Sequence, residues 1–240
     1  DPVMRDIRLH GTWTTISGAV YGEFNRGKHV IPYDPEMALV AVRRFLVVDP
    51  APSKPTAIGA FGVDYKGNTF MFGELRTKGT IPEICAEARS HFKDFTFDRY
   101  LMDPNWDWDD HELGVNRMDL WRDEGMPFEA ASDDKEYGME LVHKALATDP
   151  ISEKPHFQVM NNCERTIWEF EHYRWMPKKP SDDLTYKPHT RDVDDDLVTC
   201  VRYFHAHASA WGALKPQRAT RSKTRIQRHC LSGSSALAVA

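Results

Sequence analysis

Short apolar runs separated by turn-forming residues characterise the first half of the chain. Residues 44–48 form a nearly continuous apolar run that ends at Asp49 and a proline, which is typical of a buried strand. Residues 56–63 predict a second strand, and the turn-forming sequence at 64–68 predicts a hairpin to a third strand at 69–75. These runs therefore predict one strand followed by a β-hairpin.

Helical and extended patterns alternate after this hairpin. Thr80 and Glu83, with Pro82 between them, have the arrangement of a capping box at the start of a helix that we expect to extend to about Lys93. The further expected elements are a strand at 99–102, a helix at 113–124 closed by Gly125, a strand at 128–131, a helix at 133–147, a strand at 156–160, and helices at 162–171 and 194–210. This order predicts an α/β fold with a mixed β-sheet flanked by helices on both faces.

The length of 240 residues suits one domain with extensions. We expect residues 1–36 to form a linking arm, residues 37–210 the domain, and residues 211–240 a basic, disordered tail. The sequence has no apolar run of membrane-spanning length and no secretory leader pattern, so we expect a protein that is not secreted. Its cysteines are scattered without CxxC spacing, which argues against a zinc site and favours a reducing cytoplasm.

Charge is distributed unevenly along the chain. The net charge is −5, yet no Asp or Glu occurs from Ser209 onward. The basic residues of that stretch are Lys215, Arg218, Arg221, Lys223, Arg225 and Arg228. An acidic body with a basic tail fits a carboxylate-metal enzyme whose tail binds DNA phosphates by counterion release. It fits equally an acidic protein with a solvated end, so charge alone leaves both open.

Carboxylates stand at the ends of three expected elements. Asp49 and Asp103 each end a buried strand and precede a proline, and residues 194–196, all aspartates, open the last helix. Ligands gather at strand ends in α/β sheets, and carboxylates are favourable at helix N-termini. Oxygen donors without His or Cys suit two Mg²⁺ or Mn²⁺ ions, which can activate water for phosphodiester hydrolysis. Each aspartate alone is also typical of a turn or a helix cap, so the prediction depends on their conjunction.

The motifs around these carboxylates resemble, in the same order, those of the nuclease domain of the large terminase subunit of tailed phages. The matching stretches are RLHGTW (8–13), GAVYGEF (18–24), HVI (29–31), VVDPAPSKPTA (47–57), GEL (73–75), TIPEI (80–84), YLMDP (100–104), CERTIWEFEHYRW (163–175) and the stretch 195–203 with its Arg-Tyr pair. The resemblance covers about residues 8–205. It implies an RNase H-like fold and a two-metal-ion endonuclease that cuts double-stranded viral DNA during genome packaging, here without the ATPase half.

The resemblance also implies roles for particular residues. Asp49, Asp103 and Asp196 would be the catalytic metal ligands, with Asp195 as the alternative third ligand. Independently of the resemblance, Glu74 at the end of the third strand could help to bind metal or water, and His189 shortly before the third motif could help with phosphate or water; each is also typical of a surface residue. Many relatives carry a His in the third motif and an Asp before the Arg-Tyr pair, where this chain has Asp196 and Thr199. The third ligand therefore stays open among Asp194, Asp195 and Asp196.

The partners that the resemblance implies are double-stranded DNA, the terminase ATPase domain, the small terminase subunit and the portal, in the cytoplasm of the host cell. Two alternatives remain. Another RNase H-like nuclease or recombinase, of the resolvase or integrase type, would prefer branched or terminal DNA. A non-catalytic DNA-binding module with a structural acidic cluster would show neither Mn²⁺-dependent nicking of a plasmid nor stabilisation by Mn²⁺.

Overall fold

The computed structural model describes residues 18–110, 114–132, 134–150, 152–176, 190 and 195–210. Its centre is a seven-stranded mixed sheet. The strand order is β1 (Val30–Ile31), β9 (Phe157–Met160), β4 (Thr69–Thr77), β3 (Thr56–Val63), β2 (Arg43–Asp49), β5 (Arg99–Met102) and β8 (Glu129–Ala130). The three central strands β4, β3 and β2 are antiparallel, and the outer pairs are parallel. The predicted strand, hairpin and mixed sheet are confirmed.

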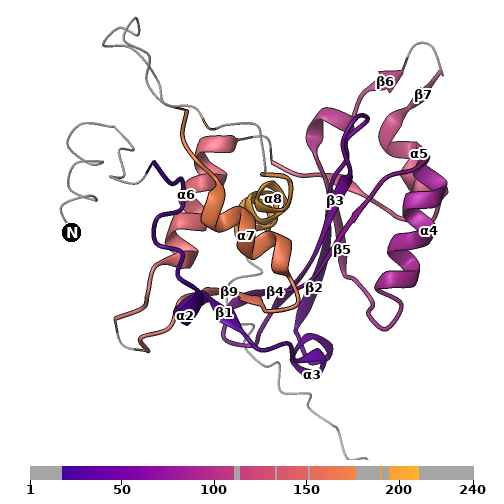
Figure 1. The fold of residues 1–240 in the computed structure, drawn as a ribbon. Helices are drawn as coiled ribbons and strands as arrows, with labels where there is room; N and C mark the ends of the chain where they lie inside the picture. The colour runs from indigo at the N-terminus through magenta and orange to yellow at the C-terminus, as the bar shows by residue number, and fades with distance from the viewer. Residues whose placement is uncertain are drawn as a thin grey trace, which may run out of the picture.

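Helices cover both faces of this sheet (Figure 1). One face carries α6 (Lys135–Leu146), α7 (Glu164–His172) and α8 (Asp196–Ala210), and the other carries α4 (Ile81–His91) and α5 (Arg117–Asp123). The Glu83 carboxylate accepts the Thr80 backbone N–H at 2.8 Å at the start of α4, as the capping-box pattern predicted. The α/β class with helices on both faces is therefore confirmed. None of the described helices is both long and apolar enough to cross a bilayer.

Most of the shortest elements were not predicted, because two to five residues carry no readable periodicity; the strand β8 is an exception. Those not predicted are β1, α2 (Arg26–His29), α3 (Pro35–Leu39), the 3₁₀ helix η1 (Pro104–Trp106), and the paired strands β6 (Asp109–Asp110) and β7 (Val115–Asn116). The helix expected from residue 113 begins at Arg117, since the two residues before it form β7 and Asn116 caps the helix. Within residues 18–36, β1 lies in the main sheet and Tyr21 lies in the core. The boundary at residue 36 stays a prediction.

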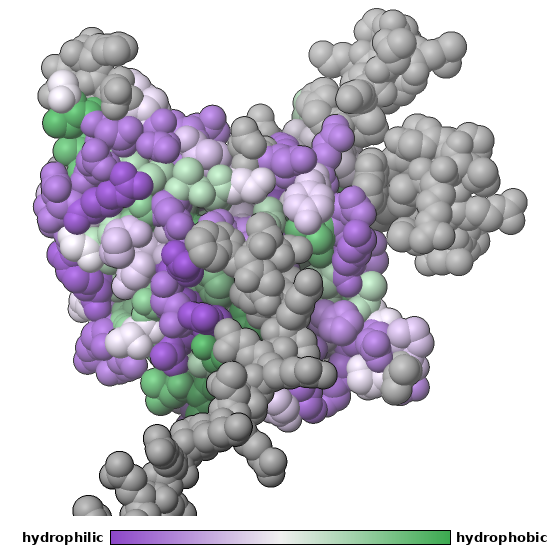
Figure 2. Space-filling model, turned by 180° about the vertical axis from the view of Figure 1, so that it is seen from behind, coloured by the Kyte–Doolittle hydropathy of each residue, from purple (hydrophilic) through white to green (hydrophobic). Residues whose placement is uncertain are grey.

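Alternate residues of the central strands fill two separate hydrophobic clusters. Phe45 and Val47 of β2 face the side of α8, whereas Leu46 and Val48 face the side of α4. Burial on both faces explains why the strand sequence is continuously apolar rather than alternating. The outer surface seen from behind is mainly hydrophilic, with hydrophobic residues in small groups (Figure 2). The sheet is thus a rigid, two-sided core whose strand ends are held by packing.

Candidate active site

The pairing of β2 with β5 brings Asp49 and Asp103 to the same edge of the sheet. Val48 is paired with Met102 in parallel register, so the next residue of each strand, Asp49 and Asp103, are neighbours. The Asp103 backbone N–H donates to the Val48 carbonyl at 3.3 Å, which ties the two strand ends together. The structure therefore places these two predicted site residues side by side.

Asp103 is oriented by the turn that follows it. Its carboxylate accepts the backbone N–H of Asn105 at 3.0 Å and the Asn105 side-chain amide at 2.9 Å, so it caps η1. Tyr203 of α8 is also hydrogen-bonded to Asp103, and burial together with this carboxylate raises the pKa of the Tyr203 hydroxyl. The proline after Asp103 begins η1 and ends the strand.

Asp196, the first residue of α8, lies beside these strand ends and is almost fully buried, at 3% exposure. Its carboxylate accepts hydrogen bonds from the Lys54 ammonium group and from Arg76 Nη2, the latter at 2.8 Å. Arg76 stands opposite Ala57, which stands opposite Asp49, so Arg76 and Asp49 belong to one row across β4, β3 and β2. Directly opposed residues share a face of the sheet, and this face is the one that α8 covers (Figure 1).

The carboxylates are close enough for their charges to interact. Burial raises the pKa of Asp49 to about 7; Lys54 opposes this rise, and the charges of Asp103, Asp196 and Asp195 add to it. A buried carboxyl with several like charges around it is the arrangement that a bound cation relieves. Such a strongly perturbed carboxyl group also marks candidate functional sites in general.

Asp195 is oriented differently from Asp196. Its carbonyl accepts the Thr199 N–H at 2.7 Å in the first turn of α8. Its side chain interacts with Tyr173, whose pKa is raised first by burial and further by the charge of Asp195 and a hydrogen bond with it. Of the two described aspartates, Asp196 is therefore the one bonded to the cationic residues beside the strand ends. Asp194 and His189 lie outside the described residues, as do Lys215, Arg218, Arg221, Lys223 and Arg225.

Glu74 has a structural partner that the sequence did not predict. Its carboxylate accepts the backbone N–H of Arg165 at 2.8 Å, and the backbone N–H and hydroxyl of Thr166 at 2.9 and 2.6 Å. These are donors of the first turn of α7. Glu74 therefore caps α7, and its expected action on metal or water stays a prediction.

Sequence reasoning missed Lys54, Arg76 and Tyr203, which all contact the acidic residues. Two of them carried a signal. Lys54 lies in the VVDPAPSKPTA motif just after Asp49, and Arg76 lies two residues after Glu74 on the same strand. The alternation of side chains along a strand places Glu74 and Arg76 on one face.

The donor set suits a hard divalent cation in its chemistry. Within the described residues, no group of three or more His, Cys, Asp or Glu side chains is gathered closely enough to hold a metal ion. Asp49 and Asp103 form an adjacent all-oxygen pair, and Lys54 and Arg76 supply the positive charge beside Asp196. Carboxylate oxygens are the ligands that Mg²⁺ and Mn²⁺ prefer. The strand-end pair therefore fits part of the coordination of such an ion, whereas the third carboxylate, Asp196, is bonded to Lys54 and Arg76 in this structure.

No protein-family model and no curated protein matches the chain. Solved structures do. The large terminase of the thermophilic bacteriophage D6E is 20% identical, with a TM-score of 0.64, over 81% of this chain and 45% of that protein. The P22 large terminase nuclease domain is 16% identical, with a TM-score of 0.56, over 79% of this chain and 92% of that domain. The large terminase nuclease of the thermophilic phage G20c, solved with bound cobalt, is 13% identical, with a TM-score of 0.53, over 81% of this chain and 98% of that nuclease.

The match extends over almost the whole of the two separate nuclease domains but over less than half of the D6E protein. At these identities the likeness establishes the fold. The expectation of an RNase H-like fold is confirmed by the mixed sheet and these neighbours together. The chain therefore has the fold of the nuclease domain of phage large terminases.

Proposed function

We propose that this chain is a metal-dependent endonuclease that cuts double-stranded viral DNA during genome packaging, as the nuclease part of a large terminase. The observation that carries the proposal is the adjacent pair Asp49 and Asp103 at one sheet edge, with Asp196 beside it. The nuclease-domain fold of the neighbours supports the same reading.

Asp49, Asp103 and Asp196 would hold two Mg²⁺ or Mn²⁺ ions, with Asp195 as the alternative third ligand. The bound cobalt of the G20c nuclease supports the use of a divalent ion. Such ions lower the pKa of bound water and stabilise the leaving oxygen of a phosphodiester. The chain's own part is to fix the donors: the strand register sets Asp49, and the η1 turn and Tyr203 orient Asp103.

DNA carries dense negative charge, so an acidic centre needs cations around it to admit a phosphate. Lys54, half exposed beside Asp196, is placed to meet a phosphate at the acidic edge. We assign the wider contact with the DNA backbone to the basic tail residues Lys215, Arg218, Arg221, Lys223 and Arg225. That assignment follows from the distribution of charge along the sequence.

The D6E large terminase is more than twice as long as the part that this chain matches. We propose that the chain works beside a terminase ATPase domain, a small terminase subunit and a portal, in the cytoplasm of an infected cell. Its cutting would then be controlled by those partners rather than by base-specific contacts of its own.

The test is nicking of a supercoiled plasmid with Mn²⁺ by the wild-type protein and by Asp49→Ala. The matched control is Asp94→Ala, because Asp94 is an exposed aspartate in the turn after α4. We expect the wild type and the control to nick, and Asp49→Ala to be inactive. Equal nicking by all three proteins would reject the assignment of Asp49 to the active site. A strong preference for branched DNA would instead favour a resolvase-type enzyme, and no nicking with no stabilisation by Mn²⁺ would favour a binding module.

A further inference from the structure

Glu169 of α7 is a carboxylate with no exposed surface, and the proposed chemistry does not use it. One of its oxygens accepts the backbone N–H groups of Leu197 at 2.8 Å and Val198 at 3.1 Å. The other accepts the Arg165 Nε–H at 3.0 Å. Leu197 and Val198 are the second and third residues of α8, so Glu169 binds donors that a helix leaves without a partner in its first turn.

Glu169 thereby takes over a role that usually falls to the residue before the helix. A side chain at that position commonly caps the same two N–H groups, and aspartate is among the favoured residues. Here Asp195 occupies the position, and its side chain interacts with Tyr173 instead. Glu169 therefore binds the two donors, while Asp195 interacts with Tyr173 and Asp196 with Lys54 and Arg76.

The helix that carries Glu169 is held in the same way. Glu74 of β4 binds the first-turn donors of α7, and Arg76 of the same strand binds Asp196. Glu74 therefore binds the start of α7, and Glu169 of α7 binds the start of α8. Asp196, at the start of α8, in turn binds Arg76 of β4. This closed circuit of charged contacts ties the first turn of α8 to the central sheet.

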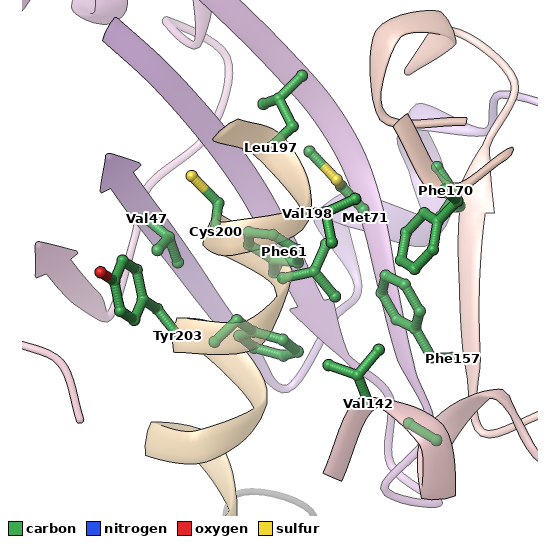
Figure 3. Packing of buried hydrophobic residues seen from close by; sticks show 14 of the residues in the cluster. Val47, Phe61, Met71, Val142, Phe157, Phe170, Leu197, Val198, Cys200 and Tyr203 are labelled. Atoms are coloured by element: carbon green, nitrogen blue, oxygen red, sulfur yellow. The ribbon is translucent and has the colours of Figure 1, made fainter. Parts of the chain in front are cut away.

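Apolar packing supports the circuit, because the first turn of α8 and its later turns lie in one buried hydrophobic cluster. In the close view, Leu197 and Val198 come from the same helix as Cys200 and Tyr203, alongside strands that carry Val47, Phe61 and Met71 (Figure 3). Farther along the helix, Phe204 stacks on Phe61, with ring centroids 4.6 Å apart. Loss of the Glu169 contacts should therefore loosen the backbone of the first turn, where Glu169 bonds α8, more than the later turns.

We infer that Glu169 is a positioning residue that holds the third acidic motif, Asp195 and Asp196, in register with Asp49 and Asp103 for metal binding. The inference rests on the proposed function. It concerns how the third ligand is placed, whichever of the two aspartates that ligand is.

The experiment compares Glu169→Gln and Glu169→Ala with the wild type and with Glu171→Gln. Glu171 lies on the same helix, but it is more exposed and pairs with Arg26, so its variant removes a carboxylate without touching α8. Three quantities are measured: the Mn²⁺ dissociation constant by calorimetry without DNA, the nicking rate at saturating Mn²⁺, and hydrogen exchange at the Leu197 and Val198 amides.

For Glu169→Ala we expect Mn²⁺ binding to weaken about tenfold or more, nicking to fall by a similar factor, and exchange at the two amides to speed up. Glu169→Gln keeps one acceptor oxygen but loses the charge and meets Arg165 with an amide donor, so it should lie between wild type and Glu169→Ala. Exchange near Val201 and Phe204 should stay slow in both variants. Glu171→Gln should match the wild type throughout.

Folded Glu169 variants with wild-type Mn²⁺ affinity, nicking and amide exchange would overturn the inference. If Glu169→Ala does not fold, the Glu169→Gln measurements decide on the same terms. If the wild type neither binds Mn²⁺ nor nicks DNA, the proposed function fails. Hydrogen exchange still decides the positioning claim in that case, since unchanged protection of Leu197 and Val198 would reject it.

Discussion

The two sides of the candidate site are built by different means. At the strand ends, Asp49 and Asp103 are neighbours because adjacent parallel strands end in register. At the start of α8, Asp196 is held by Lys54 and Arg76, which lie 142 and 120 residues away in sequence. The first arrangement follows from local strand geometry, and the second depends on a network of distant charged groups. The strand-end pair should therefore tolerate changes elsewhere that the α8 side does not.

The largest expected effect lies at the strand ends. Asp49→Asn or Asp103→Asn should each lower the rate of plasmid nicking at saturating Mn²⁺ by about 100-fold or more, because a carboxylate ligand is replaced by a neutral amide. Asp49→Asn should not lower the melting temperature of the metal-free protein, since it removes a buried charge that its acidic neighbours disfavour. Nicking rates test the predicted loss of activity, and thermal melts test the predicted melting temperature. If either variant kept more than a tenth of wild-type activity, the assignment of Asp49 and Asp103 as metal ligands would be contradicted.

On the α8 side, comparison of Asp196→Asn with Asp195→Asn tests which of the two aspartates is the third metal ligand. We expect about 100-fold slower nicking for Asp196→Asn and about tenfold or less for Asp195→Asn, because Asp196 is bonded to the cations at the strand ends whereas Asp195 interacts with Tyr173. Mn²⁺ titrations of both variants separate loss of the ion from loss of the reaction. The reverse ranking would make Asp195 the third ligand.

The later turns of α8 pack against aromatic rings of the sheet. His205 is buried between Phe157 and Phe204, and burial lowers its pKa to about 3. The unfolded chain takes up a proton below a pH of about 6.5 and the folded protein does not, so stability falls as the pH drops through that value toward 3. The loss between pH 7 and pH 5 should be about 2 kcal/mol.

His205→Leu should lack this part of the acid sensitivity. Urea unfolding of both proteins at pH 7 and pH 5 measures it, and contributions from the other titrating groups cancel in the comparison. An equal loss of stability in both proteins would show that His205 does not titrate as its burial requires. Nicking by His205→Leu at pH 7 should stay close to wild type, since His205 is packed among rings rather than among the carboxylates.

Sequence reasoning reached the strand-end side of the site but only part of the α8 side. The continuous apolar runs placed β2, β3 and β5 closely, because strands buried on both faces leave that signature, and Asp49 and Asp103 follow as the residues at which two runs end. The start of the last helix was also predicted. Its partners Lys54, Arg76 and Glu169 were not predicted. The position of Lys54 and Arg76 near Asp49 and Glu74 indicated the site but not their bond to Asp196, and nothing in the sequence indicated that Glu169 meets α8.

The smallest expected effect is at Lys54, because its side chain is about half exposed. Lys54→Ala removes the ammonium group beside Asp196 and leaves the charges of Asp49, Asp103 and Asp196 less compensated. Because Lys54 is half exposed and the buried Asp196 keeps its bond with Arg76, the melting temperature of the metal-free protein should fall by only about 2 °C. The rise in melting temperature on adding Mn²⁺ should nevertheless be larger than in the wild type, because the ion no longer competes with the ammonium group for Asp196.

The matched control is Lys93→Ala, which removes an exposed lysine just beyond the end of α4. It should leave the stabilisation by Mn²⁺ unchanged. If Lys54→Ala and the wild type gain the same stabilisation, Lys54 and the ion do not share Asp196, and the α8 side then contributes to metal binding less directly than the strand ends. If the stabilisation by Mn²⁺ is larger in Lys54→Ala alone, the Lys54 ammonium group and the Mn²⁺ ion compete for Asp196, and Asp196 is the residue of α8 that binds the ion.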